Sequence, residues 1–186
     1  MITSYIAILF NVVTAFVGCL LILRAFIFYQ RLSIFDPIAR LAWFGTNWLV
    51  IPVSRLVKPG RRWEWASVLS AFIMAAVVAI VTRQVTGLPL SWLGVPVCAV
   101  FLLLRWVLVL VLWGTIIFVI LFWFHPTFTA YVMVWRLMNP ILGPISSRLP
   151  RIAGLDWSPL IVFLIVNALL YWVTPLSQGY FVSAWF

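Results

Sequence analysis

Four long apolar runs divide the chain, and two stretches of mixed apolar and basic residues separate the first run from the second and the third from the fourth. A hydrocarbon core about 30 Å thick requires roughly 20 apolar residues in a helix. Each run approaches or exceeds that length, so the pattern predicts four membrane-spanning helices. Their expected ranges are about 5–29, 65–82, 96–124 and 158–174.

The two mixed stretches carry polar residues at helical spacing, which predicts amphipathic helices lying at the membrane interface. The polar residues of the first stretch are Asp36, Arg40, Asn47 and Ser54, and those of the second are Arg136, Asn139, Gly143 and Ser146. Prolines interrupt both stretches, so we expect a break near Pro52 and no continuous straight helix through Pro140 and Pro144. Each connection is therefore predicted to form an interfacial or re-entrant helical hairpin.

The two halves of the chain match at one constant shift of 92 residues. The matched pairs are Asn47 and Asn139, Pro52 and Pro144, Ser54 and Ser146, Glu64 and Asp156, and Trp65 and Trp157. Two spans in each half give both halves the same orientation, which predicts parallel repeats related by an axis along the membrane normal. We expect a single all-α membrane domain over 1–186, with a first repeat at 5–82 and a second at 96–174.

Composition supports a membrane protein and argues against catalysis. Hydrophobic residues make up 66% of the chain and charged residues 8%, with a mean hydropathy of +1.21, whereas soluble domains are roughly 25% charged. Three acidic residues and one histidine provide no recognisable pairing of a nucleophile with a general base, so we expect no enzyme. The net charge of +9 is better explained by topology than by nucleic-acid binding.

The basic residues are concentrated in the two connections between spans. Nine of the twelve lie there: Arg31, Arg40, Arg55, Lys58, Arg61, Arg62, Arg136, Arg148 and Arg151. The N-terminal tail, the middle connection and the C-terminal tail together contain one basic residue, Arg83. The positive-inside rule then predicts cytoplasmic connections, with both termini outside the cytoplasm.

A few polar residues fall inside the predicted spans. Arg105 lies ten residues into the third span, where an arginine needs a partner, a bound anion or a route by which it snorkels to the outer interface. Asn11 and Asn167 are intramembrane amides that need partners, and Arg24 is expected to snorkel at the inner end of the first span.

No cofactor is expected. Cys19 and Cys98 lie in apolar runs, and the chain has no cysteine pair at metal-ligand spacing. Haem ligation by His125 with Met133 or Met138 is disfavoured, because a lone interfacial histidine is more often structural.

The run "NPILGPISSRLPRIAGLDWSPLIV" resembles the signature of the YggT family, called YlmG in some lineages. The matching positions are Pro140, Pro144, Arg148, Pro150, Gly154, Asp156, Ser158 and Pro159. The chain departs from the family pattern at Gly143, Ser146 and Ser147, where the family tends to have arginines. Trp48, Lys58 and Arg62 replace the expected residues in the first copy.

The resemblance implies a small multi-pass protein of the bacterial inner membrane without an established enzymatic activity. Relatives are associated with osmotic-stress tolerance, with division or nucleoid organisation, and in plastids with assembly of a haem-bearing cytochrome. Relatives with one fold therefore have different roles. For this reason the resemblance predicts location and architecture more directly than mechanism.

The residues just before the second and fourth spans are predicted to form turns and helix caps. This group comprises Pro144, Gly154, Asp156, Ser158, Pro159 and Glu64. A carboxylate at a helix N-terminus is favoured by the helix dipole, and a serine followed by proline suits a helix start. If Glu64 and Asp156 also pair with a cation, the expected partners are Arg148 and Arg151.

These features together predict an assembly or organising factor for other membrane components. The residues expected to contact anionic lipid headgroups or other membrane proteins are Arg136, Asn139, Arg148, Arg151, Arg55, Lys58, Arg61 and Arg62. The alternative is participation in ion or osmolyte movement, which would require several polar groups lining a path through the spans.

Overall fold

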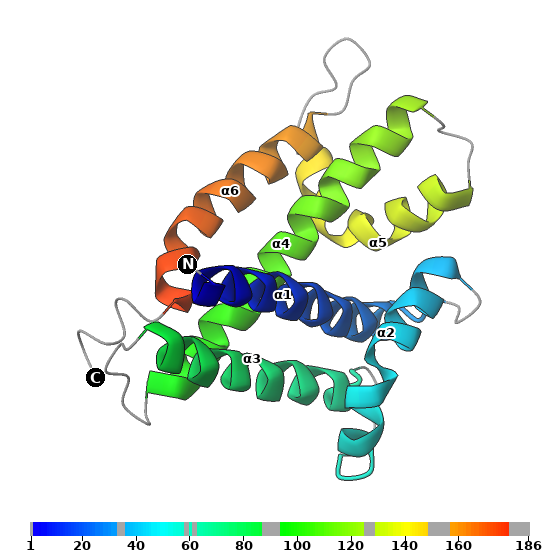
Figure 1. Ribbon diagram of the computed structural model, residues 1–186. Coiled ribbons are helices and arrows are strands. Elements are labelled where there is room, and N and C mark those ends of the chain that lie inside the picture. The colour runs from blue at the N-terminus through cyan, green and yellow to red at the C-terminus, as the bar shows by residue number, and fades with distance from the viewer. Residues whose placement is uncertain are drawn as a thin grey trace. The chain divides into compact units, whose positions relative to one another are not determined.

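The computed structural model is all-helical over the residues that it describes, which are 2–32, 36–57, 60, 63–86, 94–124, 129–148 and 157–178 (Figure 1). Its six helices are α1 (Ile2–Tyr29), α2 (Pro37–Ser54), α3 (Trp65–Thr86), α4 (Gly94–Phe124), α5 (Thr129–Ser146) and α6 (Ser158–Ser177).

Four of these helices, α1, α3, α4 and α6, are long and apolar enough to cross a membrane. Their candidate spans are Leu9–Tyr29, Trp65–Thr82, Gly94–Phe124 and Ser158–Ser177. The predicted helical class and the four apolar helices are confirmed, and the chain is a multi-pass membrane protein.

The helices between the spans differ in part from the prediction. Pro52 lies in the last turn of α2, and Pro140 and Pro144 lie inside α5, yet both helices are continuous. The end of α2 at Ser54, two residues after Pro52, agrees with the predicted break, whereas α5 continues through Pro140 and Pro144. The hairpins stay a prediction, because parts of both connections lie outside the described residues. A proline removes one backbone N–H and crowds the preceding turn, but the hydrogen bonds of the neighbouring residues are enough to continue the helix.

The first or last residues of several helices are also separated by 92 residues. The start of α2 at Pro37 corresponds to the start of α5 at Thr129, and their ends correspond at Ser54 and Ser146. The starts of α1 and α4 are separated by the same shift. This spacing supports the prediction of two repeats.

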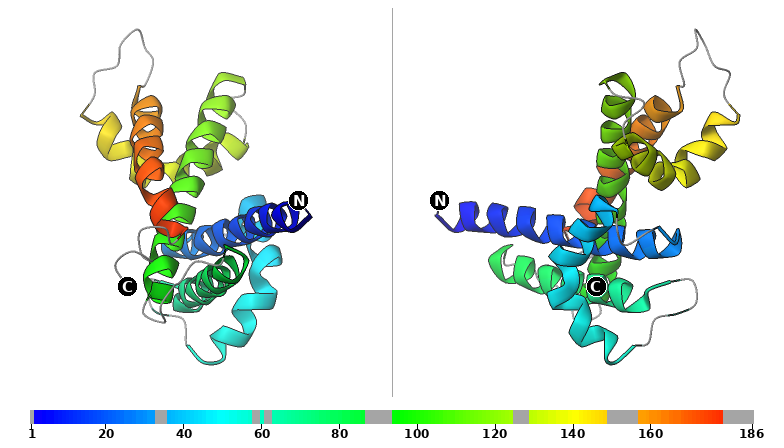
Figure 2. Two further views of the ribbon diagram at one scale, coloured as in Figure 1. Left: turned by 60° about the vertical axis from the view of Figure 1, so that its left-hand side comes forward. Right: turned by 90° about the vertical axis from the view of Figure 1, so that its right-hand side faces the viewer.

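The chain forms two compact units. The first unit comprises 1–107 and 172–186, and its helices α1, α2 and α3 pack against one another. In Figures 1 and 2, α1 and α3 lie side by side, and α2 crosses near the end of α1 and the start of α3. The chain leaves α1 through a tight turn in which Arg31 has a φ of 54°, with Arg31 N–H donating to Phe28 O and Leu32 N–H to Ile27 O.

Small residues allow the helices of the first unit to approach closely. Ala75 and Ala79 of α3 pack in one buried cluster with Ala99 and Trp106 of α4. Gly18 of α1 faces the indole ring of Trp106. Such small residues favour helix association in a membrane, where lipid tails are as apolar as the helix surfaces.

The second unit comprises 108–171, which includes α5 and parts of α4 and α6. Val134, Leu137, Met138 and Leu142 form the buried face of α5. The Met138 side chain lies against Gly114 of α4. The ring of Tyr131 in α5 stacks on that of Phe118 in α4, with centroids 5.6 Å apart.

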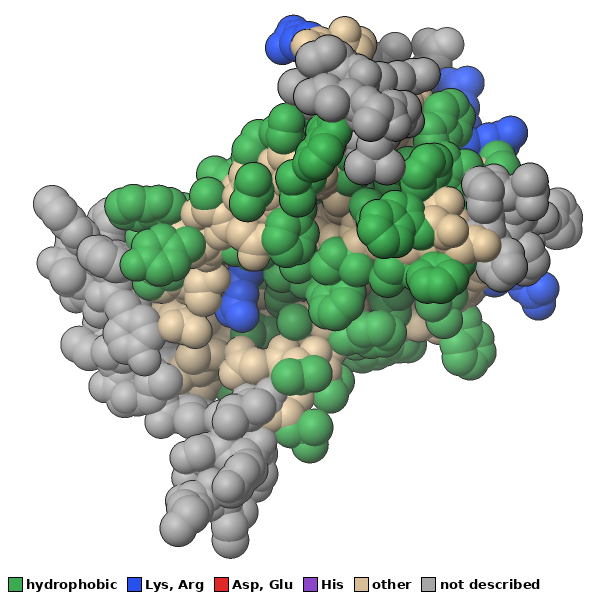
Figure 3. Space-filling model, turned by 90° about the horizontal axis from the view of Figure 1, so that it is seen from above, with side chains coloured by type: hydrophobic (Ala, Val, Ile, Leu, Met, Phe, Trp, Pro, Cys, Tyr) green, Lys and Arg blue, Asp and Glu red, His purple; other side chains and the backbone are tan. Residues whose placement is uncertain are grey.

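The surface is largely apolar, as a surface in contact with lipid must be. Figure 3 shows hydrophobic side chains over most of the described part of one face, with Lys and Arg in a few separate places. Large apolar side chains such as Trp123 and Tyr171 are 71% and 78% exposed. A water-soluble protein would bury most of this area.

We expect Gly18→Ala to destabilise the protein more than Gly114→Ala. A Cβ at position 18 would lie 2.4 Å from ring carbons of the buried Trp106, whereas one at position 114 would meet the flexible end of Met138 at 2.7 Å. The methionine end can rotate away, but the indole is held by its neighbours. Gly18→Ala should cost about 1–3 kcal/mol, measured by thermal unfolding in detergent. Equal shifts for the two variants would contradict this account of the α1–α4 contact.

Candidate functional site

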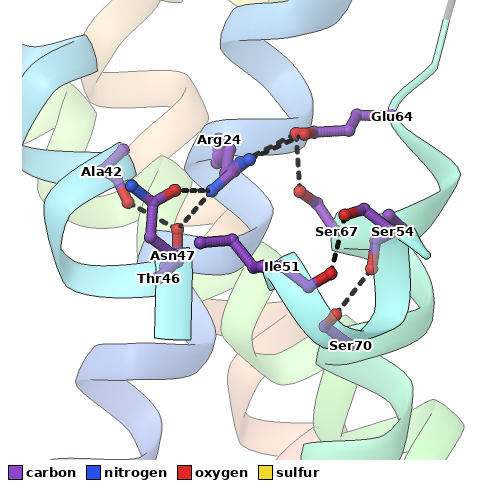
Figure 4. A network of polar contacts seen from close by, with 10 residues as sticks. Arg24, Ala42, Thr46, Asn47, Ile51, Ser54, Glu64, Ser67 and Ser70 are labelled. Carbon is purple, nitrogen blue, oxygen red and sulfur yellow. Dashed lines mark hydrogen bonds and ion pairs between the residues drawn. The ribbon is translucent and has the colours of Figure 1, made fainter. Parts of the chain in front are cut away.

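A buried ion pair joins α1 to the residue that precedes α3. Nε and Nη2 of Arg24 donate to the two carboxylate oxygens of Glu64 at 2.9 and 2.8 Å (Figure 4). The side chains of Arg24 and Glu64 are 8% and 12% exposed. This bidentate geometry fixes the orientation of both groups, and pairing compensates for much of the cost of burying each charge.

The third nitrogen of the guanidinium binds α2. Nη1 of Arg24 donates to Asn47 Oδ1 at 2.8 Å and to Thr46 Oγ1 at 3.3 Å. The Thr46 hydroxyl is fully buried and donates to the carbonyl of Ala42 at 2.6 Å. One side chain of α1 therefore connects α2 with the start of α3, as Figure 4 shows.

Glu64 is also held by α3 itself. Ser67 Oγ donates to Glu64 Oε2 at 2.6 Å, and the backbone N–H groups of Ser67 and Val68 donate to the Glu64 carbonyl. The carboxylate thus lies at the N-terminus of α3, where the helix dipole favours negative charge.

One aromatic ring lies over Arg24, and two others stack on each other at residues near the charged pair in the sequence. The Cζ atom of Arg24 lies 5.0 Å from the ring centroid of Trp43, within the range of a cation–π contact. Tyr29 at the end of α1 stacks on Trp63, with ring centroids 4.6 Å apart. These contacts reinforce the same junction between α1, α2 and the start of α3.

Helical periodicity explains why these side chains meet. Arg24 lies three residues from Leu21 and from Ile27, which are both fully buried, so it shares the inward face of α1. The buried face of α2 consists of Ala39, Ala42, Thr46 and Val50 at spacings of three and four residues, and it brings Thr46 against α1.

The structure corrects two sequence interpretations at this site. Arg24 does not snorkel but is buried, and Glu64 pairs with Arg24 rather than with Arg148 or Arg151. A signal was present in the sequence: Arg24 lies near the end of one apolar run, and Glu64 immediately precedes the next. Consecutive antiparallel spans bring those two ends to the same side of the membrane.

The other predicted intramembrane polar residues lie outside this network. Asn11 is exposed in the first unit and makes a polar contact. Asn167 is exposed in the second unit, and its amide donates to Phe163 O of its own helix at 2.8 Å. Arg105 is half-buried in α4 within electrostatic range of Cys19, and it forms no ion pair or hydrogen bond with the described part of the chain.

The predicted contact residues on α5 lie on its outward side. Arg136 and Asn139 are exposed, as is Arg148 two residues after the helix. Trp135 is partly exposed next to Arg136, and the opposite face of α5 is buried. This arrangement can present cations and an amide to lipid headgroups or to a partner protein.

The remaining predicted residues divide between the described and undescribed parts of the chain. Arg55 and Pro144 are exposed, and Ser158 and Pro159 are buried at the start of α6. The predicted residues outside the described ranges are Lys58, Arg61, Arg62, His125, Arg151, Gly154 and Asp156.

Comparison with known proteins agrees with the signature in the sequence. A family profile described as CCB3/YggT matches residues 97–177. The protein YggT of Escherichia coli is 26% identical over 162 residues, which cover 86% of this chain and 84% of that protein. A protein of Haemophilus influenzae is 25% identical over 166 residues, or 88% of each chain. The names of these relatives state no activity, and no solved structure gives a significant match.

We expect Arg24→Leu and Glu64→Leu each to destabilise the protein by about 3–5 kcal/mol, because each leaves the opposite charge buried without its partner. The double variant should be destabilised by much less than the sum of the two. Unfolding in mixed detergent measures all three, with Arg40→Leu, at an exposed position of α2, as the control. Additive effects would show that the pair is not energetically coupled.

Proposed function

Because the chain matches the CCB3/YggT profile over residues 97–177 and is similar to YggT of Escherichia coli along most of its length, we propose that it belongs to this family and is a non-catalytic assembly or organising factor of the bacterial inner membrane. In this proposal it contacts other membrane components through the outward faces of the connections between its spans.

The observation that carries this proposal is the two-sided character of α5. One face, with Leu137 and Met138, is buried in the second unit, while Arg136, Asn139 and Arg148 are exposed. These exposed side chains form no hydrogen bond or ion pair with the described part of this unit. Guanidinium and amide groups at a membrane surface suit anionic headgroups and acidic or carbonyl-rich segments of a partner protein.

The buried charges of the first unit favour an organising role over transport. Arg24 and Glu64 bind each other and their neighbours in α2 and α3, so they serve the packing of the unit. A transport path would require several polar side chains turned toward one another. The alternative, participation in ion or osmolyte movement, rests among the described residues mainly on the half-buried Arg105, with Asn11 and Asn167 as further polar groups in the spans.

We further propose that the two halves are parallel repeats, with both connections in the cytoplasm and both termini outside. The matched bounds of α2 and α5 support the repeat. The concentration of basic residues in the connections supports the orientation.

The orientation can be tested with single cysteines at Ser147 and Gln178, which are both exposed, after replacement of Cys19 and Cys98. We expect a membrane-impermeant maleimide to reach position 178 in intact spheroplasts and position 147 only in inverted vesicles. The reverse pattern would contradict the proposed orientation.

The organising role can be tested with a photo-crosslinking amino acid at Ser147. The variant Arg136→Gln/Arg148→Gln should insert normally but lose most of its crosslinks to a neighbouring membrane protein, because the charges that orient the contact are removed. Arg105→Gln, the matched change inside a span, should retain them. In liposomes the unmodified protein should give no ion flux above empty vesicles. Selective flux that Arg105→Gln abolishes, and that the double variant preserves, would support transport instead.

A further inference from the structure

The second unit contains a cavity between α4, α5 and the start of α6. Its volume is about 590 Å³, within the range of about 300–1,000 Å³ typical of ligand pockets. Most of the lining is apolar, with Ile116 and Phe118 from α4 and Leu160 and Phe163 from α6. The cavity lies within one unit and shares no residue with the buried ion pair.

The 92-residue shift explains why this space is open. Ile116 corresponds to Arg24, Trp135 to Trp43, and Pro159 to Ser67. In the first unit, the arginine lies over Trp43 and the serine binds the carboxylate that pairs with it. In the second unit, the three counterparts all line the cavity. Isoleucine and proline cannot form that polar network, so the matching region stays unfilled.

Four side chains of the lining carry hydrogen-bond donors. They are Trp123, Trp135 and Trp157, through their indole N–H groups, and Tyr131, through its phenol. Within the described part of the chain none of these four side-chain donors has a hydrogen-bond partner. An indole donates but cannot accept, so the cavity is suited to a ligand that supplies acceptor oxygens.

We propose that this cavity binds one membrane phospholipid. An acyl chain fills the apolar interior, and ester or phosphate oxygens accept hydrogen bonds from the indole and phenol groups. An acyl chain gains little free energy by moving from the bilayer into the cavity, because both environments are apolar. Selective retention therefore depends on these donors and on the shape of the lining.

A cationic ligand fits the lining less well, although Trp43 holds a guanidinium in the first unit. There the cation is paired with Glu64, whereas no carboxylate lines the cavity of the second unit among the described residues. Among the described residues, a cation in this cavity would meet aromatic rings and no counter-charge.

The experiment measures retention of dioleoyl phosphatidylglycerol by the purified full chain, with native mass spectrometry after detergent exchange. We expect one retained lipid per chain. Ile116→Trp fills the cavity and should lower retention about tenfold. Ile117→Trp, a neighbouring exposed position of α4 outside the lining, should leave retention unchanged.

A second pair of variants removes a donor and keeps an aromatic ring in the lining, which keeps the proposal testable if Ile116→Trp fails to fold. Trp157→Phe retains an aromatic ring but has no N–H, and should weaken retention about threefold. Trp113→Phe, at an exposed position of α4 outside the lining, should have no effect.

Two competitors distinguish the chemistry of the bound group. Neither dodecyltrimethylammonium, which has an alkyl chain and a cation but no acceptor, nor inorganic phosphate should displace the phospholipid. Displacement by the first would assign the site to cations, and displacement by the second would assign it to the anion alone. Either result, or equal retention by Ile116→Trp and Ile117→Trp, would overturn the proposal. The crosslinking test at α5 is separate, so failure of one proposal is distinguishable from failure of the other.

Discussion

The arrangement of the first three helices depends on the buried pair of Arg24 and Glu64. Helices in a membrane gain little from apolar contact alone, because lipid tails offer the same contact. Polar contacts and close packing must therefore decide which helix faces lie together. Arg24 binds Glu64 ahead of α3 and Asn47 in α2, so one guanidinium constrains the rotation of three helices. Since a buried charge without its partner is strongly unfavourable, other rotations of these helices are penalised.

The two halves, which we propose to be repeats, have different interiors. In the first unit, a charged and hydroxyl-bearing network occupies the junction of the helices. In the second unit, the position that matches Arg24 is Ile116, and the surrounding space is an aromatic-lined cavity. We interpret this difference as a division of roles, in which the first unit is closed by its own side chains and the second can receive a ligand.

The connecting helices also differ in their outward faces. The exposed stripe of α2 is mostly apolar, with Phe44 and Trp48 87% and 65% exposed, and it carries one exposed cation, Arg40. The exposed stripe of α5 carries Arg136 and Asn139 instead. An apolar stripe suits burial among acyl chains, while a polar stripe suits the headgroup region. The proposed contacts with other membrane components are therefore assigned mainly to α5.

The sequence by itself determined the four apolar helices, the amphipathic helices between them and the exposed basic stripe of α5. Each of these follows from residues close together in the chain, because span length and helical periodicity are local properties. Local reasoning underestimated the continuity of α5, since it counted a lost hydrogen bond at Pro140 without the bonds that continue the helix on either side. Only the tertiary structure decided that Glu64 pairs with Arg24 and that Ile116 borders a cavity. Pairing and open space depend on how helices rotate and approach one another, and residues 40 positions apart acquire a distance only when their helices pack.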